Sequence, residues 1–500
     1  MSSARVSERL SRGPSPVDGD AHAAAPTFVE NKTFDEIELG ESATLTRTLS
    51  RKDIDLFAVM SGDVNPAHVD DEFARSDVFH KIIAHGMWGG SLISTLLGTK
   101  LPGPGTIYLE QTLQFRRPVA LGDTITVSVT ARSKDAQRKR ISLDCLCRNQ
   151  RDEVVIEGSA TVLAPTQKVR RPRAVLPEVQ MHERGVLLHA LIERARPLEP
   201  IRAAVVHPVD RDPLLGSVDA YQEGLIVPTL VGPERRIRAC AEAEGIDISG
   251  FRIVATEHSH AAAAAAVQLV RAGELDGLIK GSLHTDELMH AVLAPEAGLR
   301  TDRRMSHVFV IEVPTQSRPL LISDAALNVQ PDLAAKRDIV QNAIELAQAI
   351  GIELPKVAIL SAIETVSAKL RSTLDAAALA KMAQRGQITG GIVDGPLAFD
   401  DAVSSAAARE KRIASPVAGQ ADVLIVPDLE SGNIVVKQLD FLGGAQGAGV
   451  VLGARAPIAL TGRAYTPLER VASCALAALI ARRAATAPGM GKPPSDRSVS

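Results

Sequence analysis

The chain has 500 residues, which is too many for a single hydrophobic core, so we expect several domains. A formal net charge of −3 and an aromatic content of 3% give neither the basic surface nor the stacking side chains typical of nucleic-acid-binding proteins. No apolar run approaches the roughly 18 residues of a membrane span, and four cysteines without a CxxC pair indicate reduced thiols in a cytoplasmic protein rather than a metal site.

Residues 1–27 lack the apolar segment of a secretory signal, and we expect them to form a disordered tail. Residues 28–165 begin with a predicted strand ("ATLTRTLS") and a short predicted helix ("KDIDLFAVM"). The stretch "AHGMWGGSLISTLLG" is apolar nearly all round and predicts a buried helix. Four alternating runs follow as predicted strands: "TIYLEQTLQF", "TITVSVTAR", "RISLDCLCR" and "VVIEGSATVL". One buried helix followed by antiparallel strands predicts an α+β domain whose sheet wraps the helix.

Residues 166–180 are rich in proline and arginine without periodicity, which predicts a linker. From residue 181 to about 485, short apolar runs such as "GLIVPTLV" and "HVFVIEV" alternate with helical stretches such as "KRDIVQNAIELAQAIG". This alternation predicts a mainly parallel sheet covered on both faces. We expect two α/β lobes with a cleft between them, the second covering about 326–455, and a disordered tail over 486–500.

The stretch "SGDVNPAHVDDEF" concentrates polar chemistry ahead of the buried helix. Asn65 followed by proline is a good helix cap, so one interpretation is a capped turn with a solvated His68. Asp63 is not needed for capping, however, and Gly86 stands at the start of the buried helix, where free amides favour a developing oxyanion. An acid/base pair beside an oxyanion site suits the addition of water to an activated double bond.

The segments "GDVNPAHVDDEFA" and "IIAHGMWGGSLISTLLG" resemble the D-x-N-P-x-H signature of MaoC-like, (R)-specific enoyl-CoA hydratases with the hot-dog fold. The resemblance covers about residues 28–165. It implies that Asp63 and His68 jointly activate water and protonate the substrate α-carbon. It further implies that Asn65 orients that pair and that the Gly86 amide binds the thioester oxygen.

In the second half, "LIKGSLHTDELMHAVL" predicts a strand followed by a helix. Lys280 would lie at the end of the strand, and Ser282 and Thr285 would place hydroxyls at the helix start, a good arrangement for an anion. The alternative is a Ser/Thr cap beside a solvated lysine. A similar arrangement of Arg304 and Ser306 precedes the strand in "RRMSHVFVIEV", and we expect these five residues to bind substrate.

Arg463, in "PIALTGRAYTPLERV", follows a predicted strand, where its guanidinium could grip a phosphate in a bidentate manner. Glu469 completes a predicted capping box with Thr466, which gives it a structural explanation as well as a chemical one. The run "GGAQGAG" precedes a strand instead of following one, so we interpret it as a loop and not as a dinucleotide fingerprint.

The blocks "LIKGSLHTDELMHAVL", "RRMSHVFVIEVP", "GPLAFDDAVS", "VPDLESGNIVVKQL" and "PIALTGRA" resemble the phosphate acetyl/butyryltransferase family over about residues 181–485. The resemblance implies two lobes of the isocitrate and isopropylmalate dehydrogenase type. It implies that Arg463 grips phosphate and that Glu469 stands where acetyltransferases have a proposed base for the thiol. One position departs from the family: Gly462 replaces a serine, and Thr461 is a neighbouring hydroxyl that could substitute.

Together these features predict a bifunctional enzyme acting on CoA thioesters, in which an enoyl-CoA hydratase is fused to a phosphate acyltransferase. The substrates would be enoyl-CoA, acyl-CoA, acyl phosphate, CoA and phosphate, with no metal or redox cofactor. We expect a homo-oligomer formed through both domains, and neither nucleic acid nor membrane as a partner. Two alternatives are a non-catalytic acyl-CoA-binding or assembly module in place of one half, and an oxidoreductase on a dehydrogenase-like scaffold.

Overall fold

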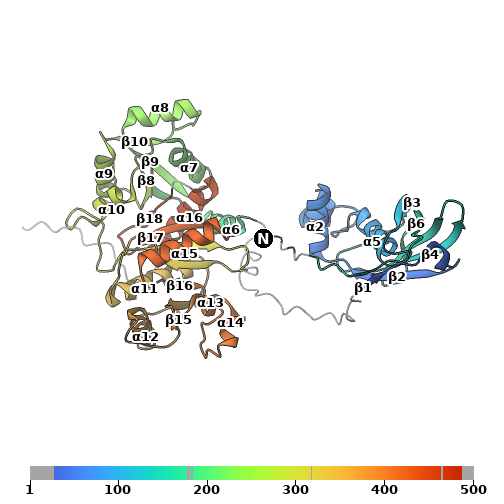
Figure 1. Cartoon of the computed structure of the whole chain (residues 1–500). Helices are drawn as coiled ribbons and strands as arrows, with labels where there is room; N and C mark the ends of the chain where they lie inside the picture. Colours follow the sequence, from blue (N-terminus) through green and yellow to red (C-terminus); the bar gives the residue numbers. More distant parts are fainter. Residues whose placement is uncertain are drawn as a thin grey trace, which may run out of the picture. The chain divides into compact units, whose positions relative to one another are not determined.

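A computed structural model describes residues 28–176, 179, 181, 184–316, 318–462 and 465–486. The chain divides into two compact units, which are described here separately: an N-terminal unit over residues 28–176 and a C-terminal unit over residues 184–486 (Figure 1). The tails expected at the two ends of the chain lie outside the described residues, except that the last helix extends to Thr486.

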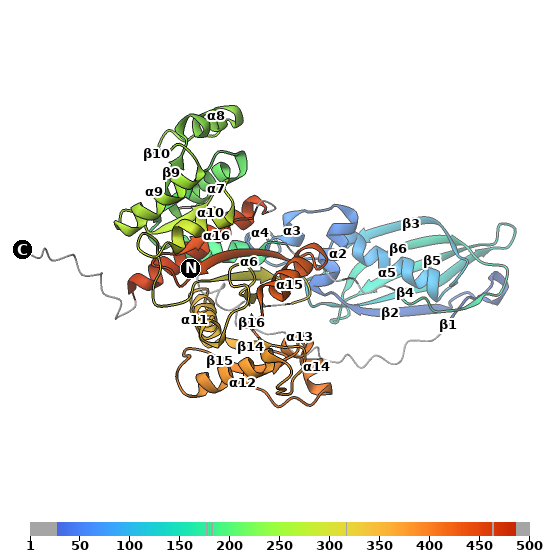
Figure 2. The same ribbon diagram turned by 60° about the vertical axis from the view of Figure 1, so that its left-hand side comes forward.

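The N-terminal unit is an antiparallel sheet packed around one long helix, as predicted. The strand order is β2-β4-β5-β6-β3, and α5 (Gly86–Thr99) packs against β4 and β2 (Figure 2). Cys145 and Cys147 point into the same core from one strand, and burial raises their thiol pKa values to about 11 and about 12. The other elements are β1 (Phe28–Glu30), η1 (Phe34–Glu36), β2 (Ser42–Thr48), α2 (Arg51–Ser61), α3 (Pro66–Val69), α4 (Asp71–Ser76), β3 (Ile107–Phe115), β4 (Thr124–Asp135), β5 (Arg140–Arg148), β6 (Val154–Leu163) and β7 (Arg170–Pro172).

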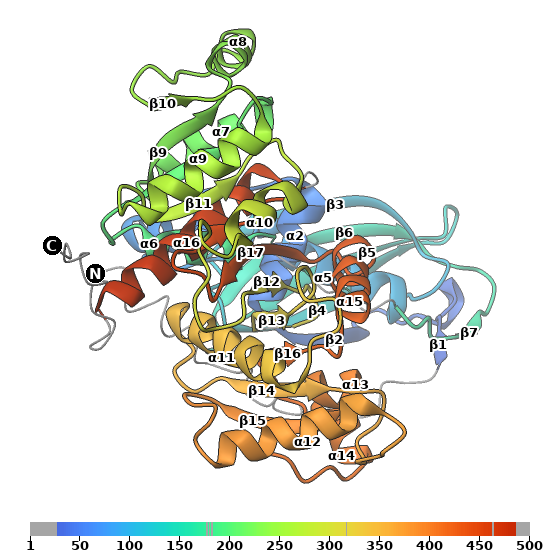
Figure 3. The same ribbon diagram turned by 90° about the vertical axis from the view of Figure 1, so that its left-hand side faces the viewer.

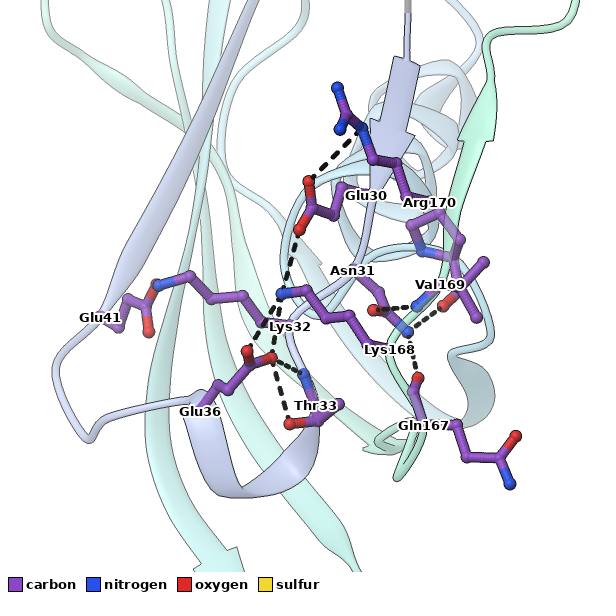
Figure 4. A network of polar contacts seen from close by, with 11 residues as sticks. Glu30, Asn31, Lys32, Thr33, Glu36, Glu41, Gln167, Lys168, Val169 and Arg170 are labelled. Atoms are coloured by element: carbon purple, nitrogen blue, oxygen red, sulfur yellow. Dashed lines mark hydrogen bonds and ion pairs between the residues drawn. The ribbon is translucent and has the colours of Figure 1, made fainter.

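The first residues of the expected linker belong to this unit. β7 pairs antiparallel with β1, and Asn31 fastens the returning chain: its side-chain amide donates to Gln167 O (2.9 Å) and Pro104 O (3.0 Å), and its oxygen accepts the amide of Val169 (2.8 Å). Figure 4 shows these contacts beside the ion pairs of Lys168 with Glu30 and Glu36. The linker prediction is therefore wrong for residues 166–172, because a side chain distant in sequence supplies their hydrogen bonds.

The C-terminal unit is built on one eleven-stranded sheet with the order β10-β9-β8-β11-β18-β17-β12-β13-β16-β14-β15. Both ends are parallel as predicted, whereas β12 and β17 run antiparallel to their neighbours in the middle. The strands are β8 (Ile201–Val206), β9 (Ile226–Gly232), β10 (Arg252–Ala255), β11 (Gly277–Lys280), β12 (Ser306–Glu312), β13 (Leu320–Ser323), β14 (Lys356–Leu360), β15 (Ile392–Leu397), β16 (Val423–Ile425), β17 (Gln446–Leu452) and β18 (Ile458–Ala459).

Helices cover both faces of this sheet, and alternate residues of a strand reach opposite cores. Val205 belongs to a core that runs along the whole sheet, whereas Val206 belongs to a separate cluster at one end. Figure 3 shows α9 and α10 at one end of the unit and α12 at the other. The helices are α6 (Val186–Ala195), α7 (Arg211–Gln222), α8 (Glu234–Glu244), α9 (Ser259–Arg271), α10 (Thr285–Leu293), α11 (Leu333–Ala349), α12 (Arg371–Gln384), α13 (Phe399–Val403), α14 (Ser405–Glu410), α15 (Leu429–Phe441) and α16 (Pro467–Thr486).

Two details of the predicted organisation need correction. β12 and β13 pair with β17 and β16, so the second half of the sheet begins near residue 306 and not near 326. The glycine-rich run 443–449 is a loop only in its first half, because Gln446–Gly449 already pair with β12. In both cases the pairing partner lies more than 90 residues away, where local sequence patterns carry no information about it.

Candidate active sites

The first candidate site begins in the loop that joins α2 to α3. Gly62, with a left-handed φ of 76°, ends α2 and turns the chain into Asp63. The Asp63 carboxylate accepts the amide of Asn65 (3.2 Å), and the Asn65 side chain in turn accepts the amide of Ala67 (3.2 Å) at the start of α3. Asn65 is therefore the predicted helix cap, and this capping holds the backbone on which Asp63 and His68 are mounted.

His68 is held close to Asp63 with a defined protonation pattern. Its Nδ1 lies 3.0 Å from the carbonyl oxygen of Ile83. Because a carbonyl only accepts hydrogen bonds, Nδ1 carries the proton and the lone pair of the neutral ring is on Nε2. Asp63 is exposed and His68 is half-buried, and a carboxylate oxygen of the one lies within 4.8 Å of a ring nitrogen of the other. A carboxylate and an imidazole at this separation can hold a water molecule between them.

Gly86 is the first residue of α5, a helix of 14 residues. The amides of a first helical turn have no partner within the helix and lie at the positive end of its dipole, so they can donate to an anionic oxygen. Space beside Gly86 is limited: a Cβ there would lie 3.1 Å from the ring of Phe115. A side chain at this position would therefore meet the Phe115 ring, which accounts for glycine here.

Sequence reasoning missed His85, although it was part of the quoted "AHGM" motif. The side chain is buried, its Nε2 lies 2.9 Å from the main-chain oxygen of Asp63, and its ring lies 4.0 Å from that of His68 between centroids. His85 thus contacts both members of the predicted acid/base pair. Its position directly before Gly86, at the N-cap of the buried helix, was the available signal.

The second candidate site is a cavity of about 360 Å³ at the carboxyl ends of β11 and β18. Lys280 and Ser282, two of the predicted binding residues, line it with Gly462 and with Arg211 and Arg470, which sequence reasoning did not single out. The Ser282 hydroxyl oxygen accepts the amide of Asp210 (3.1 Å), so its proton remains available to a ligand. Asp210 and Asp212 also line the cavity, and Asp212 forms ion pairs with Arg211 (3.4 Å) and Arg470 (3.6 Å). The three cations outnumber the two carboxylates, and together with the hydroxyl they suit phosphate or an acyl-phosphate oxygen.

Arg463 itself lies outside the described residues, and its neighbour Thr461 is already engaged. Thr461 is buried, and its hydroxyl donates to Lys280 O (3.0 Å) while Lys280 Nζ lies 3.5 Å from Thr461 O. These contacts tie the loop that leads to Arg463 to the end of β11. The Thr461 hydroxyl proton is committed to the main chain, so Thr461 is a poor substitute for the serine that Gly462 replaces.

A second, larger cavity of about 810 Å³ lies between α10 and the N-terminal part of α11. Thr285 and Arg304 line this cavity, so the two hydroxyls expected at one anion site, Ser282 and Thr285, open into different cavities. Arg304 is held by its Nε, which donates to Asn328 (2.6 Å). Four arginines line this cavity together with four aspartates, and the arginines are Arg300, Arg303, Arg304 and Arg337.

Two predicted site residues have structural partners instead of an open face. Ser306 is fully buried in β12 and accepts from the Asn342 side chain (2.9 Å), so its predicted contact with substrate is wrong. Glu469 forms the predicted capping box, accepting the amide (2.7 Å) and hydroxyl (2.9 Å) of Thr466, and it also accepts the amide of Gly447 (3.1 Å). Both Glu469 oxygens are occupied, which favours the structural interpretation of this residue.

Comparison with known proteins relates each unit to a known family. Residues 255–478 match the family model described as "Phosphate acetyl/butaryl transferase". A phosphate acetyltransferase of Rhizobium meliloti is 58% identical over 293 residues, which are 59% of this chain and 93% of that protein. The chain belongs to the phosphate acetyl/butyryl transferase family. A phosphate butyryltransferase of Clostridium acetobutylicum is 42% identical to this transferase over 58% of this chain and 97% of that protein.

The transferase also carries a domain of a second family at its N-terminal end. Residues 35–145 match the model for a MaoC-like domain. The unliganded R-hydratase PhaJ1 of Pseudomonas aeruginosa is 41% identical to the transferase over 31% of this chain and 99% of that chain, with a TM-score of 0.30. The fusion of a MaoC-like hot-dog domain with a phosphotransacylase domain is thus confirmed. Among its described residues, the transferase has no helix of the length and apolarity needed to cross a membrane.

Proposed function

We propose that this protein is bifunctional: its C-terminal unit moves a short acyl group reversibly between CoA and phosphate, and its N-terminal unit hydrates trans-2-enoyl-CoA to (R)-3-hydroxyacyl-CoA. The observation that carries the hydratase half is the approach of Asp63 to His68 beside the N-terminus of α5. The acyltransferase half is supported by the family of the C-terminal unit and by the cavity at the end of β11, which is lined by three cations and two aspartates.

In the hydration, Asp63 and His68 hold the attacking water between them. One of the pair takes a proton from the water as it adds to the substrate β-carbon, and the other delivers a proton to the α-carbon. Negative charge develops on the thioester oxygen between these events, and the Gly86 amide at the helix N-terminus stabilises it. We propose that no metal or redox cofactor takes part, because an acid/base pair and an amide donor supply what the addition of water needs.

In the acyl transfer, the CoA sulfur attacks the acyl carbonyl and the carbon–oxygen bond to phosphate breaks. The proton of the CoA thiol ends on the leaving phosphate, so that thioester and hydrogen phosphate are formed. The leaving phosphate needs cations, for which Lys280, Arg211 and Arg470 line the cavity. The carbonyl oxygen needs a donor, and the free proton of the Ser282 hydroxyl supplies one. Arg463 is proposed as the phosphate-gripping arginine by its position in the family motif.

A single set of assays on the full-length protein tests both halves. Acetyl phosphate and butyryl phosphate are each incubated with CoA and followed for thioester formation, and crotonyl-CoA is followed for loss of the enoyl thioester. Turnover in both assays is the expected result. Absence of crotonyl-CoA hydration would refute the hydratase half, and absence of thioester formation with every acyl phosphate would refute the acyltransferase half.

One observation favours a second candidate, in which the C-terminal unit binds acyl-CoA without turning it over. Gly462 removes a hydroxyl donor, and the Thr461 hydroxyl is engaged with Lys280 O. CoA binding measured by calorimetry, together with no thioester formation, would favour this candidate. Reduction of NAD(P) in the presence of substrate would instead favour the oxidoreductase alternative. The homo-oligomer, the cytoplasmic location and the dehydrogenase-like origin of the two lobes remain proposals.

A further inference from the structure

Three side chains of the N-terminal unit form a group in which acid/base catalysis uses only two. One carboxylate oxygen of Asp63, one ring nitrogen of His68 and one ring nitrogen of His85 all lie within 4.8 Å of one another. Two imidazoles and one carboxylate are also a donor set that binds transition metals. This coincidence raises the question of whether the group binds an ion.

The second ring nitrogen of each histidine is already hydrogen-bonded. His68 Nδ1 lies 3.0 Å from Ile83 O, and His85 Nε2 lies 2.9 Å from Asp63 O. Each carbonyl requires a proton on the nitrogen that faces it, so the lone pairs of the neutral rings are on His68 Nε2 and His85 Nδ1. Metal-binding histidines in proteins typically have this arrangement, in which a main-chain carbonyl fixes the tautomer and leaves the other nitrogen free for the ion.

The lone pair of His85 has no other use within the described part of the chain. Nδ1 of His85 is buried and has no hydrogen-bond partner among the described residues, although the ring is only 3% exposed. A buried acceptor without a partner is costly, and it is found in native proteins where a function or a bound species accounts for it. The neighbouring Asp63 is exposed, so an ion from solvent can reach the group from its side.

We propose that Asp63, His68 and His85 bind Zn²⁺, with water completing the coordination. Two neutral imidazoles favour zinc and its neighbours in the transition series over Mg²⁺ and Ca²⁺, which prefer oxygen donors. Ligands about 2.0–2.1 Å from a tetrahedral ion lie roughly 3.3 Å from one another. The three ligand atoms lie within 4.8 Å of one another, so binding requires the three side chains to draw closer around the ion.

Occupation of this group by zinc is a means of switching off the hydratase, an inference that rests on the proposed function. The ion takes the Asp63 and His68 lone pairs that would otherwise receive and deliver protons. Bound zinc therefore prevents Asp63 and His68 from acting in catalysis, and removal of the zinc by a chelator restores the activity. The transferase cavity at the end of β11 contains none of the three residues, so acyl transfer continues.

The direct test is calorimetric titration of the EDTA-treated full-length protein with ZnCl₂, and in parallel with MgCl₂. His85→Asn is the informative variant, because asparagine is a good residue for the N-cap position that His85 occupies. His80→Asn is the matched control: its Nδ1 is also bonded to a main-chain carbonyl, that of Arg75 (3.1 Å), but His80 belongs to no such group among the described residues. Circular dichroism checks that both variants fold, and His68→Asn replaces His85→Asn if the latter does not.

We expect saturable Zn²⁺ binding that His85→Asn weakens about 10–100-fold and His80→Asn leaves unchanged, with no comparable binding of Mg²⁺. Equal zinc affinity of wild type and His85→Asn would overturn the site. Zinc binding without inhibition of crotonyl-CoA hydration would overturn the switch alone. Zinc binding in a protein with no hydratase activity would support the site and refute the proposed hydratase, so the two failures are distinguishable.

Discussion

Replacing Asp63 by asparagine should abolish most of the hydratase rate while leaving the fold intact. The carboxylate is exposed, and its hydrogen bond from the Asn65 amide (3.2 Å) can be accepted equally by an asparagine side-chain oxygen. The free energy of unfolding should therefore change by less than about 0.5 kcal/mol. The rate effect is much larger, because an amide cannot accept the proton of the attacking water.

The expected loss in kcat is about 10²–10⁴-fold, which corresponds to roughly 2.7–5.5 kcal/mol in the activation barrier. The assay follows crotonyl-CoA hydration by the full-length protein. Asp70→Asn is the matched control: Asp70 caps α4 by accepting the amides of Glu72 and Phe73, and asparagine caps equally well. A folded Asp63→Asn variant within ten-fold of wild type, or an equal loss in Asp70→Asn, would refute the assignment.

Three further predictions concern the second site and the two folds. Ser282→Ala should lower kcat for thioester formation by about 10²–10³-fold, because it removes a donor to the developing oxyanion. Ser282→Thr keeps the hydroxyl and should retain part of the rate. A Ser282→Ala variant with the kcat of wild type would contradict this prediction. Asn31→Ala should destabilise the N-terminal unit by roughly 2–4 kcal/mol, since it breaks three partly buried hydrogen bonds. Trp88 is the only tryptophan of the sequence and lies in α5, so its fluorescence during urea unfolding reports on that unit alone. An unchanged urea midpoint would show that the Asn31 hydrogen bonds are dispensable. Lys336→Met should destabilise the C-terminal unit by about 3 kcal/mol, because it leaves the buried Asp375 without its closest cation, 2.8 Å away. Adding Asp375→Leu should restore much of this stability, measured by urea unfolding followed by circular dichroism. A Lys336→Met variant as stable as wild type would mean that the ion pair is energetically neutral.

Much of the N-terminal fold could be predicted because each element carries its own periodic signal. The four runs from "TIYLEQTLQF" to "VVIEGSATVL" became β3 to β6 nearly residue for residue, and the small-residue helix is α5. The return strand β7 could not be predicted, since three residues, two of them arginines, have no alternation to detect. Its position depends on Asn31, more than 130 residues earlier in the chain.

The residues of the candidate sites divide in a similar way. Asp63 and His68 stand five positions apart, so one turn of local structure is enough to bring them together. Ser282 and Thr285 are closer in sequence, yet they open into different cavities, because the chain turns from β11 into α10 between them. Ser306 was expected at a ligand, but it pairs with Leu452 of β17 and is fully buried against the Asn342 side chain.

The sequence by itself determined the two families, the alternation of strands and helices, and the motif that contains Asp63, Asn65 and His68. Each of these depends on the spacing of residues that are close together in the chain. Only the tertiary structure decided what lies opposite each of these residues. It brought His85 against His68, committed the Thr461 hydroxyl to Lys280 O, and placed Arg211 and Arg470 in one cavity with Lys280. These contacts join residues 17 to 259 positions apart in the chain, and such pairings follow from the packing of whole elements, which no local pattern encodes.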